Sequence, residues 1–106
     1  MVAVVTDSDF ETFIQTKGVV VVDFWAPWCG PCKMVEPTIK KLSEEFRSGV
    51  SFGKMNVDEN VGTPMKYSIQ AIPTLFFFKD GELAHRYTGV LPEKAMADKI
   101  KSLMAS

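Results

Sequence analysis

The stretch VVVVDFWAPWCGPCK at residues 19–33 joins a run of β-branched residues to a pair of closely spaced cysteines. Four valines followed by Asp, Phe and Trp are typical of a strand that is buried on both faces and therefore central in a sheet. After the cysteines, apolar residues recur at helical spacing, opposite a charged face that includes Lys33, Glu36 and Lys40. The stretch predicts a central strand that leads into an amphipathic helix, with Cys29 and Cys32 at the junction.

The rest of the chain alternates strand and helix patterns. Further strands are predicted at residues 2–5, 50–57, 74–78 and 82–88. Between the last two, Asp80-Gly81 favours a hairpin, because such a turn needs positive φ. Helices are predicted after the first strand, capped by Asp7 or Ser8 and stopped by Gly18, and at the end of the sequence, opened by Pro92. A short helix or loop precedes Tyr67, and the order indicates an α/β fold with a mixed sheet and helices on both faces.

Length and composition are those of a globular domain. The chain has 106 residues, of which 46% are apolar and 24% charged, so we expect residues 1–106 to form one domain with one core. The formal charge of -1 provides no excess of positive charge that would attract nucleic acid or an anionic membrane. No apolar run approaches the ~18 residues that a membrane span needs. These features predict a soluble, cytoplasmic protein.

The two cysteines are better explained by redox chemistry than by structure. A disulfide between Cys29 and Cys32 closes a very short loop, where the entropic stabilisation is smallest. A zinc ion or an iron-sulfur cluster normally needs four Cys or His ligands, and His85 is the only other candidate in the sequence. One chain therefore cannot complete such a site, although a dimer that contributes one cysteine pair from each chain could. The remaining interpretation is a pair of thiols that reversibly forms a disulfide in a reducing compartment.

The position of the pair assigns different roles to the two sulfurs. Cys29 meets the free N–H groups and positive dipole end of the following helix, so we expect it to be the more acidic, more exposed thiol and the attacking nucleophile. Cys32 lies one turn deeper and is expected to resolve the mixed disulfide. Pro31 is tolerated in the first helical turn and stiffens the loop, although Gly30 and Pro31 alone are also ordinary punctuation between loop and helix.

Three stretches carry a resemblance to a known family: VDFWAPWCGPCK at residues 22–33, KMNVDEN at 54–60 and KYSIQAIPTLFFFKDGE at 66–82. With them the chain resembles the thioredoxin family over essentially its whole length. The resemblance implies a five-stranded mixed sheet flanked by four helices and a general protein-disulfide reductase. It implies a monomer that needs no cofactor besides the Cys29-Cys32 disulfide, reduces client proteins with accessible disulfides, and is recharged by an NADPH-linked or ferredoxin-linked thioredoxin reductase.

The resemblance also assigns roles to two charged residues. Asp23 interrupts a buried strand, where an unpaired carboxylate costs several kcal/mol, and it matches the family's general base for the inner cysteine, here Cys32, acting through water. The alternative is a carboxylate at the strand end that reaches solvent. Lys54 matches the lysine that pairs with this aspartate, and the alternative for it is a solvated side chain.

The implied substrate-binding residues surround Cys29. Pro73 matches a proline that follows a cis peptide bond and faces the disulfide, which exposes the backbone of Ile72 to an extended client segment. Trp28, Ile72, Pro73 and Gly89 should form an apolar rim, with Gly30 and Pro31 beside the sulfurs.

A few positions depart from the family pattern. Ser68 and Ala71 stand where many members have glycine, and Pro27 where an acidic residue is common, so partner preference is open. An isomerase or oxidant of the same fold is an alternative, but such relatives usually carry histidine at the position of Pro31. A binding scaffold that uses the apolar rim without thiol chemistry is the alternative from another class.

Overall fold

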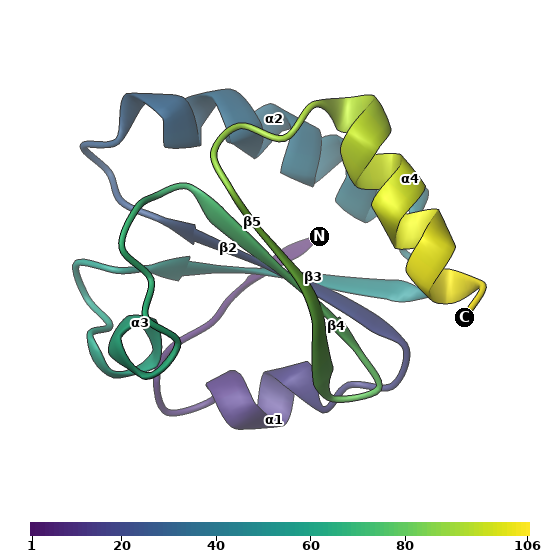
Figure 1. Cartoon of the computed structure of the whole chain (residues 1–106), viewed down its shortest axis with the longest axis horizontal. Coiled ribbons are helices and arrows are strands. Elements are labelled where there is room, and N and C mark those ends of the chain that lie inside the picture. Colours follow the sequence, from purple (N-terminus) through teal and green to yellow (C-terminus); the bar gives the residue numbers. More distant parts are fainter.

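The computed structural model describes residues 1–106 and has one five-stranded sheet at its centre (Figure 1). Its strands are β1 (Val2–Val4), β2 (Val19–Trp25), β3 (Val50–Asn56), β4 (Thr74–Lys79) and β5 (Glu82–Thr88), with bounds within one residue of the predicted ones. The order is β1-β3-β2-β4-β5. The first three of these strands run parallel, and β4 and β5 are antiparallel to their neighbours. The predicted mixed sheet is therefore confirmed.

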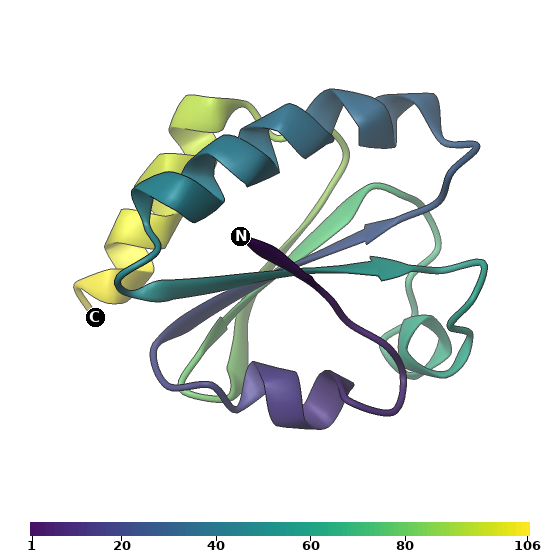
Figure 2. The same ribbon diagram turned by 180° about the vertical axis from the view of Figure 1, so that it is seen from behind.

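Four helices cover the sheet, namely α1 (Phe10–Ile14), α2 (Gly30–Glu45), α3 (Gly62–Lys66) and α4 (Glu93–Met104). α2 and α4 lie over one face, and α1 and α3 lie over the other (Figure 1). Figure 2 shows the same layers from behind, with α2 running along its side of the sheet. The α/β fold of five strands and four helices is confirmed.

β2 is buried because both of its faces are covered. Six of its seven residues are buried, and the seventh is half-buried. Val19 and Val21 pack in the cluster that contains α2 and α4, whereas Val20 and Val22 pack in the cluster that contains α1. Each such side chain contributes about 1.5–3 kcal/mol when fully buried. Because side chains alternate along a strand, Asp23 falls on the α2 side of the sheet, in line with Val19 and Val21.

The hairpin between β4 and β5 is formed by the predicted turn. Asp80 and Gly81 have φ of 49° and 87°, as a two-residue type I′ turn requires. Gly18, predicted to stop the first helix, lies beside this turn instead. Its N–H donates to Asp80 Oδ1 at 3.1 Å and its carbonyl accepts from the Asp80 N–H at 3.0 Å. Its φ of 92° favours glycine, but α1 has already ended at Ile14.

The predicted cap of α1 is wrong. Asp9 is the N-cap residue and makes no side-chain cap bond, because its carboxylate accepts from the Thr6 N–H at 2.7 Å. The Ser8 hydroxyl lies 2.9 Å from that of Thr6. Asp7 does cap a helix, but that helix is α3, which lies more than 50 residues further along the sequence.

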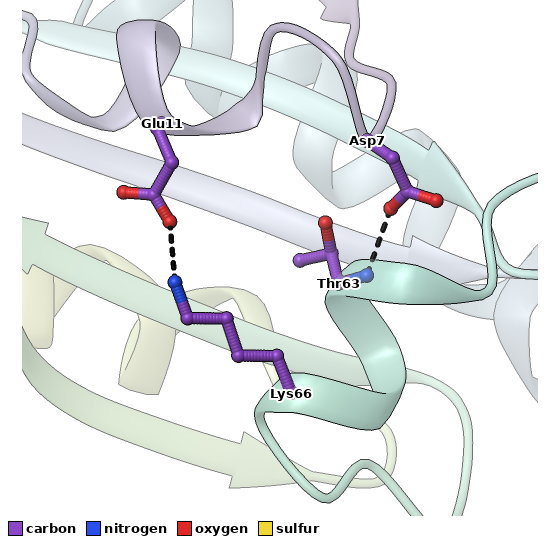
Figure 3. Close-up of polar contacts among 4 residues, drawn as sticks. All are labelled: Asp7, Glu11, Thr63 and Lys66. Atoms are coloured by element: carbon purple, nitrogen blue, oxygen red, sulfur yellow. Dashed lines mark hydrogen bonds and ion pairs between the residues drawn. The ribbon is translucent and has the colours of Figure 1, made fainter.

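Three polar contacts tie α1 and the loop before it to α3. Figure 3 draws those of Asp7 with Thr63 and of Glu11 with Lys66. The Asp7 carboxylate accepts from the Gly62 N–H at 3.0 Å and from the Thr63 N–H at 2.8 Å. The Lys66 ammonium lies 2.9 Å from a Glu11 carboxylate oxygen. Hydrogen bonding from Thr63 is the main cause of the lowered pKa of Asp7. The contacts tie α3, which precedes the loop into β4, to α1 and to the loop before α1.

We predict that Asp7→Ala lowers the free energy of unfolding by about 1 kcal/mol at pH 7, the usual value of a helix cap. The folded pKa of Asp7 is lower than the ordinary value of 3.8, so its contribution is present above that value and is lost as the pH falls through the folded pKa. Urea denaturation at pH 7 and in acid checks both points. Glu11→Gln is the control, because its ion pair is exposed and should change stability much less. An equal loss for Asp7→Ala at both pH values would contradict the capping role.

Candidate active site

The cysteines lie where β2 passes into α2, as predicted. Cys29 and Cys32 are joined by a disulfide, with their Cα atoms 5.3 Å apart. Cys29 is the N-cap residue of α2, and its Sγ accepts from the Cys32 N–H at 3.2 Å. Pro31 lies in the first turn of α2, where backbone N–H groups have no partner within the helix, so proline costs no hydrogen bond.

The expected difference in exposure between the two cysteines is not observed. Each residue is 4% exposed in this disulfide form. The reason is that both pack with Ala26 in one small cluster, against which Val57 and Ile72 also pack. The difference in role expected from the sequence therefore rests on their places in α2, at the N-cap and in the first turn, and not on exposure.

The loops around the disulfide bring the expected rim residues together. The Ile72-Pro73 peptide bond is cis, and the Pro73 carbonyl accepts from the Gly89 N–H at 2.8 Å. Trp28 is 70% exposed, and its indole N–H donates to both carboxylate oxygens of Asp58 at 3.0 and 3.2 Å. In Figure 1, the links from β2 to α2, from β3 to α3 and from α3 to β4 gather at one end of the sheet.

A mostly apolar groove lies beside this disulfide. It has a volume of about 340 Å³ and is lined by Trp28, Val57, Pro64, Ile69, Gln70, Ala71 and Ile72. At Gly30, next to Cys29, an added Cβ meets no atom within 4 Å, so this side of the site is open. Trp28 and Ile72 thus share one concave surface, and Gly30 leaves the approach to the sulfurs clear.

Asp23 lies beneath the disulfide in a second cavity, of about 280 Å³, whose lining includes Cys32 and Trp25. Its residue is 5% exposed, and its Oδ1 has no hydrogen-bond partner. The pKa of Asp23 is raised to about 7: burial is the main cause, the charge of Glu36 acts in the same direction, and the charge of Lys54 opposes both. The alternative of a carboxylate that reaches solvent at the strand end does not fit this burial.

Lys54 is the register partner of Asp23 on β3, but the two form no ion pair. The Lys54 ammonium lies 5.5 Å from the ring centroid of Trp25, in a cation–π contact. Lys54 and Asp23 line the same cavity, and the charge of Lys54 lowers the pKa of Asp23 through space. The expected pairing is therefore a neighbouring charge and not a salt bridge.

Three further residues belong to the site although the sequence pattern gives them no such role. Asp58 holds the indole of Trp28. Trp25 has a buried indole N–H without a partner at the cavity that holds Asp23. The pattern assigns Glu36 to the charged, solvent-facing side of α2, yet Glu36 lines that cavity too. Its distance of four residues from Cys32 is the one available signal, since residues so spaced share a helix face.

The structure has no helix long and apolar enough to cross a membrane. It has no group of three or more His, Cys, Asp or Glu side chains arranged to hold a metal ion.

A dithiol pair at a helix N-terminus, above a buried acid and beside an apolar groove, defines a thiol-disulfide oxidoreductase. The thioredoxin family model matches residues 1–102. The chain is 46% identical over 94 residues to a thioredoxin of Staphylococcus epidermidis, covering 89% of both chains, and 41% identical over 97 residues to one of Haemophilus influenzae, covering 91% of both. A chloroplastic M-type thioredoxin of Pisum sativum is 43% identical over 101 residues, which are 94% of this chain and 59% of the relative.

This chain belongs to the thioredoxin family. It is a protein-disulfide reductase and electron carrier that acts by dithiol-disulfide exchange, and the Cys29-Cys32 pair carries two electrons as a dithiol and gives them up when the disulfide forms. The family's chemistry needs no cofactor beyond this disulfide.

We predict that replacing the buried carboxylate removes a pH-dependent destabilisation. The folded pKa of Asp23 is about 7, above the ordinary 3.8, so the folded state binds the proton more tightly and stability falls as the pH rises between these values. At 1.36 kcal/mol per tenfold change in proton affinity, the loss is about 4 kcal/mol above pH 7. Asp23→Asn should abolish this fall. Denaturant unfolding of the oxidised protein at pH 4.5 and pH 8 measures it, and parallel pH dependence in both proteins would contradict the assignment.

Proposed function

We propose that this chain is a cytoplasmic, general reductase of protein disulfides, that a thioredoxin reductase returns it to the dithiol form, and that residues 1–106 act as a monomer of one domain. The observation that carries the proposal is the Cys29-Cys32 disulfide at the start of α2, with the Asp23 cavity on one side of it and the apolar groove on the other. The NADPH-linked and ferredoxin-linked reductases are the two donor classes for this step.

In the first step, the Cys29 thiolate attacks one sulfur of a client disulfide. A new S–S bond forms between Cys29 and the client, the client's own S–S bond breaks, and its second sulfur leaves as a thiolate that takes a proton from water. The N-cap position supports this role, because the positive end of the α2 dipole and the Cys32 N–H both favour negative charge on Cys29 Sγ.

In the second step, the Cys32 thiol gives its proton to the Asp23 carboxylate through water, and its sulfur attacks Cys29 Sγ. The Cys29-Cys32 disulfide forms, the bond between Cys29 and the client breaks, and the client's sulfur leaves as a thiolate that takes a proton from water. The shared cavity supports this route, since it joins Cys32 to Asp23 and provides room for water among polar partners. A base whose pKa is close to neutral suits proton transfer at neutral pH.

Client binding uses the groove and the backbone beside it. The apolar side chains of Trp28 and Ile72 offer non-directional contact, which tolerates many client sequences. Ile72, whose peptide bond to Pro73 is cis, packs against the disulfide cluster, where an extended client segment is able to add as a short strand. Gly89 and Pro73 close the far side of this rim through their hydrogen bond.

We predict different outcomes for the two single cysteine variants. Cys29→Ser should reduce insulin disulfide reduction to the uncatalysed rate, because the attacking sulfur is absent. Cys32→Ser should form a stable mixed disulfide with the client, because nothing resolves it. Mass spectrometry under non-reducing conditions detects the adduct. If Cys32→Ser turned over normally, the assigned order of attack would be wrong, and full function of the double Cys29→Ser, Cys32→Ser variant in cells would favour the scaffold alternative.

We predict that Asp23→Asn slows the second step by about 10²-fold at pH 8, the lower end of what a general base contributes. In the unaltered protein the rate of this step should rise through pH 7 as Asp23 ionises. The variant should lose that inflection while keeping its rate of attack on the client. Stopped-flow release of client thiol from a preformed mixed disulfide isolates the step, and an unchanged pH profile would leave Asp23 with a structural role alone.

A further inference from the structure

Two cavities meet at Asp23, each of about 280 Å³. The first is the cavity beneath the disulfide that is described above, and its lining includes Cys32, Trp25 and the beginning of α2. The second extends along α2 in the other direction and is lined by residues that include Ile39 and Ser43. Only three residues belong to the lining of both, namely Asp23, Glu36 and Lys54. Glu36 therefore lies where the two cavities meet, on the α2 side of the buried carboxylate.

The spacing of residues along α2 explains how Glu36, an exposed residue, reaches the junction of the two cavities. Glu36 follows Cys32 by one helical turn and adjoins Val35, which is fully buried beneath α2. Glu36 itself is exposed, so its carboxylate borders both solvent and the cavities. It forms no ion pair and no side-chain hydrogen bond, although Lys33 and Lys40 lie three and four residues away on the same helix. Its charge is thus free to act on Asp23.

The other charges around Asp23 are few. From β3 comes Lys54, from the first turn of α2 comes Lys33, and further along α2 come Lys40 and Glu44. The amino group of Met1 also faces the second cavity and donates to Ser43 Oγ at 3.3 Å. From β4 the register partner is the apolar Leu75. Among these groups, Glu36 raises the pKa of Asp23 and Lys54 lowers it, and the effect of Glu36 is the larger.

We propose that Glu36 is a positioning residue for the exchange reaction and acts through Asp23: its carboxylate, at the junction of the two cavities, controls when Asp23 holds a proton. The inference rests on the proposed role of Asp23 as the base for Cys32. Without Glu36, Lys54 is left as the main charge effect on Asp23, and a carboxylate stabilised by a cation is a weaker base. With Glu36, Asp23 is a stronger base for the proton of Cys32.

The test compares Glu36→Gln with Glu45→Gln, a matched control because Glu45 lies on α2 but lines neither cavity. Carbon-13 NMR titration of the Asp23 side chain in the oxidised protein gives its midpoint without any client. We expect Glu36→Gln to shift this midpoint downward, and the midpoint of the second exchange step with it, while Glu45→Gln leaves both in place. Glu36→Asp, which keeps the charge, should keep both midpoints close to those of the unaltered protein.

Other results would separate the failure of this inference from the failure of the proposed base. Equal midpoints in the unaltered protein and Glu36→Gln, or equal shifts in Glu36→Gln and Glu45→Gln, would overturn the role of Glu36 while leaving Asp23 as base. An unchanged kinetic profile in Asp23→Asn would overturn the base itself. In the Asp23→Asn background, adding Glu36→Gln should have no effect on the kinetic profile, whereas an additional shift there would show that Glu36 acts by another route.

Discussion

The burial of β2 on both faces is the constraint on which the rest of this structure depends. A strand covered by helices on each side must be apolar along its length, and the four valines of β2 satisfy that demand on the α2 side and the α1 side alike. Its neighbours β3 and β4 are fixed by pairing with it. The end of the same strand then sets where the disulfide lies, because the chain leaves the sheet at Trp25 and enters α2 five residues later.

Against this background, Asp23 is the one ionisable residue in a strand that otherwise excludes charge. The sheet offers its Oδ1 no hydrogen-bond partner, and burial keeps the proton on the carboxylate up to about pH 7. The stability that we predict the protein to lose at higher pH is the counterpart of the role proposed for Asp23 as the base for Cys32. A buried carboxylate of this kind is unfavourable for folding, and the burial of the surrounding valines offsets its cost in stability.

The sequence predicted the elements whose signals are local. The valine run determines β2, and Asp80-Gly81 determines the hairpin, because the turn accepts few other pairs. The segment Thr6-Asp7-Ser8-Asp9 contains four residues able to cap a helix, so the pattern could not decide among them. Asp7 found its partners 55 and 56 residues away. The positions of Lys54 and Glu36 depend likewise on packing between elements, and Gly53 leaves room for Val5 and Phe13 that no periodicity indicates.

The sulfur of Cys29 has two tasks, since it is both the reacting atom and the N-terminal cap of α2. In the disulfide it is a neutral, weak acceptor for the Cys32 N–H, and the covalent bridge supplies the constraint on the first turn. In the reduced form the bridge is gone, and we expect a Cys29 thiolate to be a charged acceptor for the same N–H. The bond that constrains the first turn of α2 therefore differs between the two redox states. The hydrogen bond donated by the Cys32 amide is expected to strengthen when the protein is reduced.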